Sequence, residues 1–415
     1  MSNTLPADPD RPLNPRPLRA ERGLPTIDPI THSPLHAGVD LRRYYLLHVM
    51  AAVFPTVTGL VLYGWRALIV VALVVGSALV AGLVWQRIGT RGAQIRLLHV
   101  GWFALLLGIM LPAHLATRFD AALQYAPWMI PVAAGWTLVM LMWTLGGVGA
   151  GRVSPILVGY LLLCVMYGNA FVANRVLQRD HLVTGNLMAS VPDTLRGTGE
   201  PWIWAERATG GPGDALFREN SAKLLSNFTT GTEAADPRLW LSLDVLLRDR
   251  LPPLEDFILG GEPGPIGAGC ALGVIVGGLF LLYRGLIDYR IPVLIIVFAY
   301  LTMLILPIPL VLTDEPQYHW LAVRHPSVSW QTALTFVHYE LLAGPTLFMA
   351  LFLATWPSIR PIERGARALY AALIGILAAM FQLYASVSYG PYMALLIASL
   401  LTPWFDKWLR PKPLV

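Results

Sequence analysis

Long apolar stretches, separated by short polar connections, run through most of this chain. A stretch of roughly 17–25 apolar residues is long enough to cross the hydrocarbon core of a bilayer as a helix. Ten such stretches occur, at residues 44–62, 67–85, 97–116, 127–146, 153–173, 266–284, 291–312, 330–355, 367–386 and 390–405. The pattern therefore predicts an all-α membrane protein with about ten transmembrane helices.

Polar segments divide these stretches into domains. Residues 1–40 hold eight prolines and scattered arginines, which is typical of a disordered tail. A polar segment of about 90 residues, 174–265, separates two five-helix halves, 41–173 and 266–405. A loop of this length is either functional or disordered, and its tryptophans favour a packed cap. Residues 406–415 form a second tail.

The composition agrees with a membrane protein. Of the 415 residues 55% are hydrophobic and only 13% are charged, whereas soluble domains carry about 25% charge. Cys164 and Cys270 are the two cysteines, and neither belongs to a CxxC or Cys/His ligand pattern, so no iron–sulfur cluster or structural zinc is expected within the chain. The net charge of +5 indicates membrane topology rather than nucleic-acid binding.

The distribution of basic residues predicts the orientation. With the N-terminus inside, eighteen Lys and Arg residues lie on the inner side, and the short outer connections hold only Arg66, Arg118 and Arg324. Positive charge accumulates on the cytoplasmic side of membrane proteins. We therefore expect both termini to be cytoplasmic and residues 174–265 to lie on the outer face.

One acidic residue stands within a predicted span. Glu340 lies in the eighth stretch, two residues after His338. An ionisable group at that depth is costly and marks a functional site by default, so both residues are candidates for an ion or proton path. The alternative places Glu340 at the membrane interface, paired with His338 or Arg324.

Histidines in the spans raise the possibility of a haem. His99 and His114 lie near one face of the third stretch, about 22 Å apart along the helix axis at 1.5 Å per residue. Bis-histidine ligation would need a partner on another helix, and His48 facing His99, or His338 facing His114, are the available pairs. The competing interpretation is that each histidine hydrogen-bonds a carbonyl group or a lipid headgroup.

Glycine-rich segments occur in corresponding positions of the two halves, at residues 146–151 and 260–269. Glycine lets the backbone approach a ligand or another helix closely, and broken helices in matching positions of two halves indicate a central membrane site. Tight helix packing is the alternative explanation. The glycines proposed to contact a ligand are Gly147, Gly149, Gly264 and Gly267.

An ordered set of motifs after residue 32 resembles a known family. The set comprises Ser33-Pro34-Leu35-His36, the run from Leu105 to Pro112, Gly146-Gly147-Val148-Gly149 with the run from Ser154 to Tyr160, Gly264-Pro265-Ile266-Gly267, the run from Gly277 to Pro292, Leu342-Ala343-Gly344, Gly365-Ala366-Arg367 and Leu401-Thr402-Pro403-Trp404-Phe405-Asp406. It is similar to the motifs of the RnfD/NqrB family, the flavin-carrying membrane subunits of the Rnf and sodium-translocating NADH:quinone reductase complexes.

The resemblance implies electron transfer coupled to the movement of Na⁺ or H⁺. It implies an FMN joined by a phosphoester to a threonine of the long loop, for which Thr232 is the first candidate and Thr198 the second. Riboflavin is a further flavin that such a protein can bind. The resemblance also implies partner subunits, membrane-embedded and peripheral, and a location in the bacterial inner membrane.

Several polar residues of the family are replaced here. Ser226 and Trp356 each stand where the family has Asp, and Ala268 stands where it has Glu. These departures leave an alternative open, in which the chain is a flavin-free scaffold or docking subunit of a larger redox assembly. A third hypothesis is an ion-coupled transporter with Glu340 as its coupling carboxylate.

Overall fold

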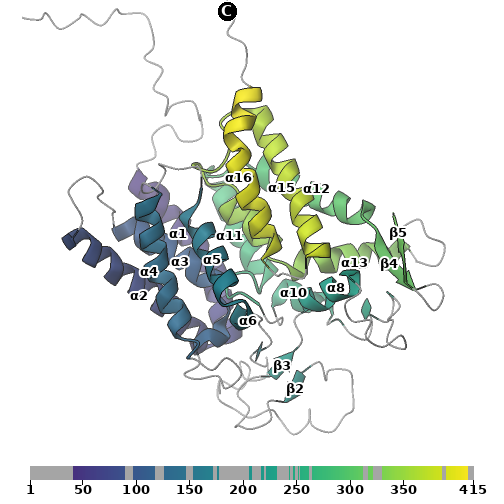
Figure 1. Cartoon of the computed structure of the whole chain (residues 1–415), viewed down its shortest axis with the longest axis horizontal. Coiled ribbons are helices and arrows are strands. Elements are labelled where there is room, and N and C mark those ends of the chain that lie inside the picture. Colours follow the sequence, from purple (N-terminus) through teal and green to yellow (C-terminus); the bar gives the residue numbers. More distant parts are fainter. Residues whose placement is uncertain are drawn as a thin grey trace, which may run out of the picture. The chain divides into compact units, whose positions relative to one another are not determined.

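A computed structural model of the chain shows helices joined by connections of varied length (Figure 1). The residues that the structure describes are 41–88, 97–116, 126–145, 153–171, 175–176, 205–207, 216–218, 221–230, 243, 246–247, 251, 253–260, 264–311, 316–320, 330–385 and 389–409. The predicted N-terminal tail lies outside them. The helices belong to one compact unit, Asp40–Val415.

The first half is built around one long helix, α2, which packs against both α3 and α4. A single glycine, Gly64, with a φ of +66°, separates α2 from α1 and lets the chain reverse between two apolar helices. The elements of this half are α1 (Leu41–Tyr63), α2 (Trp65–Ile88), α3 (Leu97–Met110), the short 3₁₀ helix η1 (Ala113–Ala116), α4 (Met129–Thr144), α5 (Pro155–Met166) and α6 (Gly168–Phe171).

In the second half α15 is the central helix, and it packs against α12 and α16. The elements of this half are α11 (Ala271–Tyr283), α12 (Arg290–Ile305), α13 (Trp330–Ala343), α14 (Thr346–Phe348), the π-helical turn η6 (Met349–Leu353), α15 (Arg364–Tyr384) and α16 (Gly390–Trp408). Helix α16 continues three residues beyond the predicted end of the tenth stretch, into the predicted C-terminal tail.

Each predicted apolar stretch contains a helix, but the helices differ in length. Within the described part of the chain, three helices are long and apolar enough to cross a membrane: Arg43–Tyr63, Trp65–Arg87 and Arg364–Tyr384. A fourth span results if Trp330–Ala343 and Thr346–Leu353, which are bent by 63° at a short break, are counted as one. The structure therefore supports a multi-pass helical membrane protein, and the remaining predicted spans stay predictions.

Two small antiparallel sheets in the connections were not predicted. Strands β1 (Arg175–Val176), β2 (Ala205–Arg207) and β3 (Leu216–Arg218) pair in the order β1-β3-β2, and β4 (Ile308–Val311) pairs with β5 (Pro316–His319). The strands have only two to four residues each, too few to leave a pattern of alternating polarity. β4 also takes the end of the predicted stretch 291–312, so α12 is shorter than expected.

The two halves meet through corresponding helices. α1 packs against α11, the first helix of the second half, and α5 packs against α16; in Figure 1, α1 and α11 lie between α2 and α4 on one side and α12, α13 and α15 on the other. Small residues on α11 allow the contact: a Cβ atom added to Gly277 would lie 2.7 Å from the Ala51 carbonyl oxygen. Close approach of this kind is the usual function of glycine between membrane helices.

Part of the long polar segment packs onto the second half. Helix α8 (Ser221–Thr230) contacts α13 and α15, and α10 (Leu254–Leu259) contacts α11 and α13. The Thr229 hydroxyl donates a hydrogen bond to the Leu383 carbonyl of α15. The buried side chains that join this contact are Leu224, Leu225, Leu243, Leu246, Leu251, Phe257, Phe336 and Val337. This part of the segment thus shares a hydrophobic core with the helices.

Candidate functional site

The break between α13 and α14 holds the most unusual polar group of the described residues. Helix α13 ends at Ala343, because Pro345 disfavours helical geometry at Gly344 and lacks an N–H group. The Gln382 side chain of α15 spans the break: its Nε2 donates to the carbonyl oxygen of Glu340, and its Oε1 accepts a hydrogen bond of 2.9 Å from the Thr346 hydroxyl.

Glycine is required at this break. A Cβ atom added to Gly344 would lie 2.5–2.8 Å from the amide atoms of Gln382. A side chain at position 344 would therefore displace the amide that bonds both ends of the break. The sequence motif Leu342-Ala343-Gly344 coincides with this position.

The Glu340 carboxyl group is buried beside the break. The residue is 1% exposed, and within the described part of the chain its Oε1 has no hydrogen-bond partner and its carboxylate forms no ion pair. A buried, unpaired carboxylate costs several kcal/mol. The group is therefore expected to be neutralised, either by a proton or by a bound cation.

His338 does not lie beside Glu340. Side chains two residues apart on a helix point about 200° apart, and His338 is exposed whereas Glu340 is buried. The His338 ring instead lies 5.7 Å from the ring of Tyr300 on α12. Arg324, the other expected partner of Glu340, lies outside the described residues.

Of the three histidines considered for haem, His48 and His99 border the same group of aromatic rings, whereas His114 contacts α6. His48 Nδ1 lies 2.9 Å from the Tyr44 carbonyl oxygen, and His114 Nε2 lies 2.7 Å from the carbonyl oxygen of Ala170. The His99 ring contacts the Tyr45 ring at 4.2 Å. Among the described residues, no group of three or more His, Cys, Asp or Glu side chains is arranged to hold a metal ion.

A buried aromatic cluster joins α1, α3 and the connection after η6. At its centre is Trp356, which is 5.4 Å from the Phe103 ring and 5.6 Å from the His48 ring. The sequence offered no signal for this cluster, because its members come from distant parts of the chain. The members are Tyr44, Tyr45, His48, Trp102, Phe103 and Trp356.

The described glycines of the second glycine-rich segment make packing contacts. The Gly267 N–H donates to the Ile109 carbonyl oxygen at 2.6 Å, beside an isolated bridge between Pro112 and Pro265. A Cβ atom at Gly267 would lie 3.0 Å from Ile109. These contacts hold the end of α3 against the start of the second half, while Gly264 has more space around it.

The predicted flavin-binding residues are described only in part. Gly147, Gly149, Thr198 and Thr232 lie outside the described residues. Two residues before Thr232, the Thr230 hydroxyl donates to the carbonyl groups of its own helix, α8. The assignment of Thr232 and Thr198 as flavin acceptors stays a prediction.

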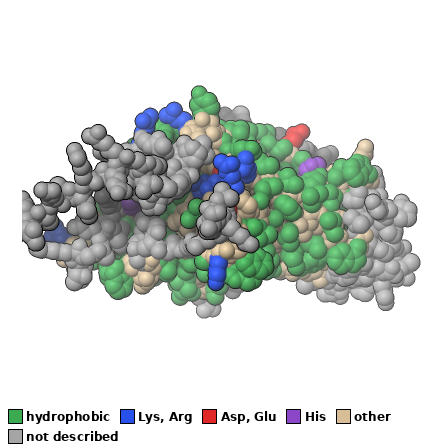
Figure 2. Space-filling view, turned by 90° about the horizontal axis from the view of Figure 1, so that it is seen from above, with side chains coloured by type: hydrophobic (Ala, Val, Ile, Leu, Met, Phe, Trp, Pro, Cys, Tyr) green, Lys and Arg blue, Asp and Glu red, His purple; other side chains and the backbone are tan. Residues whose placement is uncertain are grey.

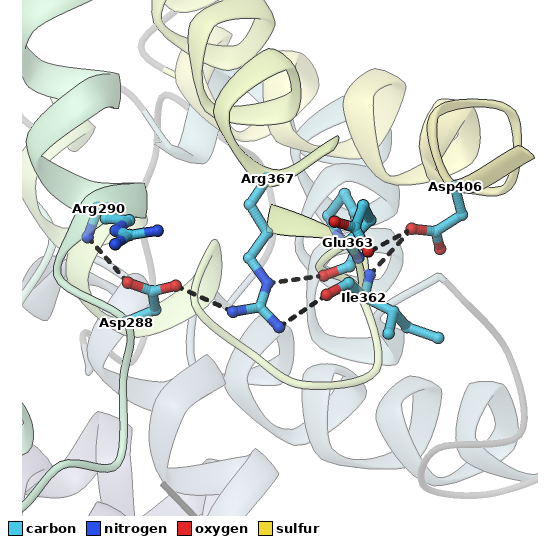
Figure 3. A network of polar contacts seen from close by, with 7 residues as sticks. Asp288, Arg290, Ile362, Glu363, Arg367 and Asp406 are labelled. Atoms are coloured by element: carbon cyan, nitrogen blue, oxygen red, sulfur yellow. Dashed lines mark hydrogen bonds and ion pairs between the residues drawn. The ribbon is translucent and has the colours of Figure 1, made fainter. Parts of the chain in front are cut away.

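A second polar site joins two connections and the end of α16 (Figure 3). Arg367 of α15 forms an ion pair of 3.0 Å with Asp288 and donates hydrogen bonds to the carbonyl oxygens of Pro361 and Ile362. Asp406 near the end of α16 accepts a hydrogen bond of 2.9 Å from the Ile362 N–H. The network fixes the α11–α12 connection and the end of α16 to the start of α15.

Comparison with known proteins decides the family. The family model described as NQR2, RnfD, RnfE matches residues 30–414. The chain belongs to this family. The resemblance found in the sequence motifs is thereby confirmed, and the match extends over both halves and the segment between them.

Similar proteins cover nearly the same length. An RnfD-type relative from Halorhodospira halophila, named as a subunit of an ion-translocating oxidoreductase complex, is 27% identical over 390 residues, which is 92% of this chain and 93% of that protein. The relatives of the same name from Yersinia pseudotuberculosis and Haemophilus ducreyi are 26% and 24% identical, each over 92% of this chain and 97% of the relative.

Proposed function

We propose that this chain is the membrane subunit of an ion-translocating oxidoreductase complex, in which it takes part in electron transfer. The family match over residues 30–414 carries this proposal, and the names of the relatives support it. The protein would work with other membrane-embedded and peripheral subunits in the bacterial inner membrane. The charge distribution favours cytoplasmic termini and an outer position for residues 174–265.

For the cofactor, we propose an FMN joined to Thr232, with Thr198 as the second candidate and riboflavin as a second flavin. A bound flavin supplies one- and two-electron transfer. Family membership supports this assignment. In the sequence Thr232 follows the end of α8 by two residues, and Thr229 of that helix is bonded to α15.

The flavin is tested on a denaturing gel. The chain is expressed with its native neighbouring subunits, denatured and viewed under ultraviolet light. A fluorescent band near 45 kDa that disappears in Thr232→Ala, and persists in Thr198→Ala, is the expected result. If the fluorescence disappears only in Thr198→Ala, Thr198 is the attachment residue. A wild-type band without fluorescence would refute covalent attachment.

For ion movement, we propose that the Glu340 carboxylate binds the coupling proton or cation. Its burial, the unpartnered Oε1 and the helix break support this role. Oxygen atoms are the ligands that hard cations prefer, and the Thr346 hydroxyl and the Gln382 carbonyl oxygen lie at the same helix break. The carboxylate would lose its charge when occupied and regain it on release.

Proteoliposomes containing the whole complex test this role. With Glu340→Gln, we expect electron transfer to continue while ion accumulation inside the vesicles falls at least about tenfold, the effect of removing a required charge. The matched control is Glu255→Gln, because Glu255 is exposed on α10, and it should leave both activities unchanged. Normal accumulation with Glu340→Gln would refute the role, and uptake without any electron donor would favour a transporter.

The flavin-free scaffold is the second candidate. Trp356, which stands where the family has Asp, is buried in the aromatic cluster and supports the view that a polar position has become part of the hydrophobic core. A dark gel band, with no flavin absorbance in the native sample and with partner subunits still co-purifying, is the result that this candidate predicts. A chain that purified alone as a stable monomer would contradict it.

A further inference from the structure

Arg360 is a buried cation in the connection between η6 and α15. The residue is 7% exposed, and its main-chain N–H donates to the Trp356 carbonyl oxygen at 3.1 Å. This turn directs the side chain into the protein, although Ile362, two residues later, is exposed. A charged side chain is rarely buried to this degree unless it is paired.

The nearby carboxylates are engaged elsewhere. Asp288 forms its ion pair with Arg367, and Asp406 accepts hydrogen bonds from the main chain of Ile362 and Glu363. Among the described residues, no carboxylate lies within 4.0 Å of the Arg360 guanidinium. The buried charge therefore has no counter-ion from the parts of the chain that the structure describes.

Neighbouring charges also leave the positive charge of Arg360 uncompensated. Burial lowers the pKa of Arg360, and the positive charge of Arg367 lowers it further, while Tyr44, Asp288 and Tyr370 act in the opposite direction. A guanidinium nevertheless remains protonated in proteins. The site is thus a protonated cation that favours an added negative charge.

The surroundings of Arg360 are those of a membrane interface. Three exposed arginines lie near the Asp288–Arg367 pair in the sequence: Arg284 directly after α11, Arg290 at the start of α12 and Arg364 at the start of α15. Figure 2 shows Lys and Arg side chains gathered among hydrophobic ones on this side. The exposed large side chains near this network are Tyr289, Ile362, Trp404 and Trp408. Aromatic and basic residues combine in this way at the level of lipid headgroups.

We propose that Arg360 binds the phosphate group of an anionic phospholipid. The planar guanidinium donates two parallel hydrogen bonds to phosphate oxygens. A phosphodiester carries one negative charge, which matches the single charge of Arg360, for which the described residues supply no counter-ion. Basic sites between membrane helices are known to hold anionic headgroups. A lipid bound here would lie near α1, the α11–α12 connection and α15, the elements whose Tyr44, Asp288 and Tyr370 act electrostatically on Arg360.

Native mass spectrometry and thermal unfolding of the full-length chain, purified with its neighbouring subunits, test this proposal. We expect the wild type to retain phosphatidylglycerol through delipidation and to bind it at least about tenfold more tightly than phosphatidylcholine, as expected for one charge-assisted bidentate contact. Arg360→Met should abolish this preference. Arg364→Met, which removes an exposed arginine four residues later, should keep it.

Equal binding of both lipids by the wild type, or an unchanged preference in Arg360→Met, would overturn the proposal. If inorganic phosphate stabilises the wild type but not Arg360→Met, and displaces no lipid, Arg360 binds free phosphate and not a lipid headgroup. If Arg360→Met does not fold, Arg360→Lys keeps the charge but loses the paired donors, and several-fold weaker binding is expected. None of these results depends on flavin or on Glu340, so the proposed function is tested separately.

Discussion

The ion pair between Arg367 and Asp288 should be a major local contribution to stability. Their side chains are only 16% and 11% exposed, and Arg367 also donates to the Pro361 and Ile362 carbonyl oxygens at 3.1 and 2.8 Å. A hydrogen bond to a charged group contributes about 1.5–3 kcal/mol and a neutral one about 1 kcal/mol. Arg367→Met keeps the apolar stem but leaves the Asp288 carboxylate with main-chain contact alone. We therefore expect the free energy of unfolding to fall by about 3–5 kcal/mol.

Equilibrium unfolding in mixed micelles, followed by tryptophan fluorescence and circular dichroism, measures this loss. The matched control is Arg364→Met, because Arg364 is exposed one turn earlier on the same helix, and it should cost less than about 0.5 kcal/mol. Combining Arg367→Met with Asp288→Asn completes a double-mutant cycle. The two losses should not add, since either substitution alone breaks the same pair.

A loss from Arg367→Met no larger than that of the control would refute this reasoning. Additive losses in the double-mutant cycle would refute it in a different way, because they would mean that Arg367 acts through its two carbonyl contacts only. High salt should change the result little, since a partly buried pair is screened less than an exposed one.

Three further predictions use the same unfolding assay. Gly135→Ala should destabilise the chain by about 1–3 kcal/mol, because the new Cβ atom would lie within 2.7 Å of main-chain atoms of α2, whereas Gly76→Ala, with nothing within 4 Å, should be neutral. Trp356→Ala should cost about 3–5 kcal/mol, as expected for a large cavity. Thr229→Val should cost about 1 kcal/mol, since it removes the hydrogen bond from α8 to the Leu383 carbonyl. If one of these three variants is as stable as the wild type, the contact on which its prediction rests does not contribute to stability.

Apolar length located the long helices well. The predicted stretches 44–62, 67–85 and 367–386 correspond to α1, α2 and α15, each within three residues at both ends. Such helices are encoded locally, because twenty consecutive apolar residues have few alternatives in a membrane. The interruption of the stretch 330–355 also has a local signal, Gly344 before Pro345, although apolar length alone treats the stretch as one span.

The side-chain contacts of the sites could not be predicted in this way. Gln382 reaches the Glu340 carbonyl oxygen across 42 residues of sequence, and Arg367 reaches Asp288 across 79. Neither pair has a spacing that a helix or a turn would impose. Their positions depend on how α13, α12 and α15 pack, and many residues distributed along the chain determine that packing.

The helix break and the buried carboxyl group are connected physically. Ending α13 at Ala343 leaves carbonyl groups without partners in the helix, and at Glu340 the Gln382 amide is a donor to that carbonyl. The same amide accepts from Thr346 on the far side of the break, so α15 holds both ends. The buried carboxyl group thus belongs to the residue whose main-chain carbonyl is bonded across the break. In the proposed role of Glu340, an ion at the carboxylate would bind to the residue whose main-chain carbonyl joins α13 to α15, and a coupling between ion binding and the position of these helices would act through that residue.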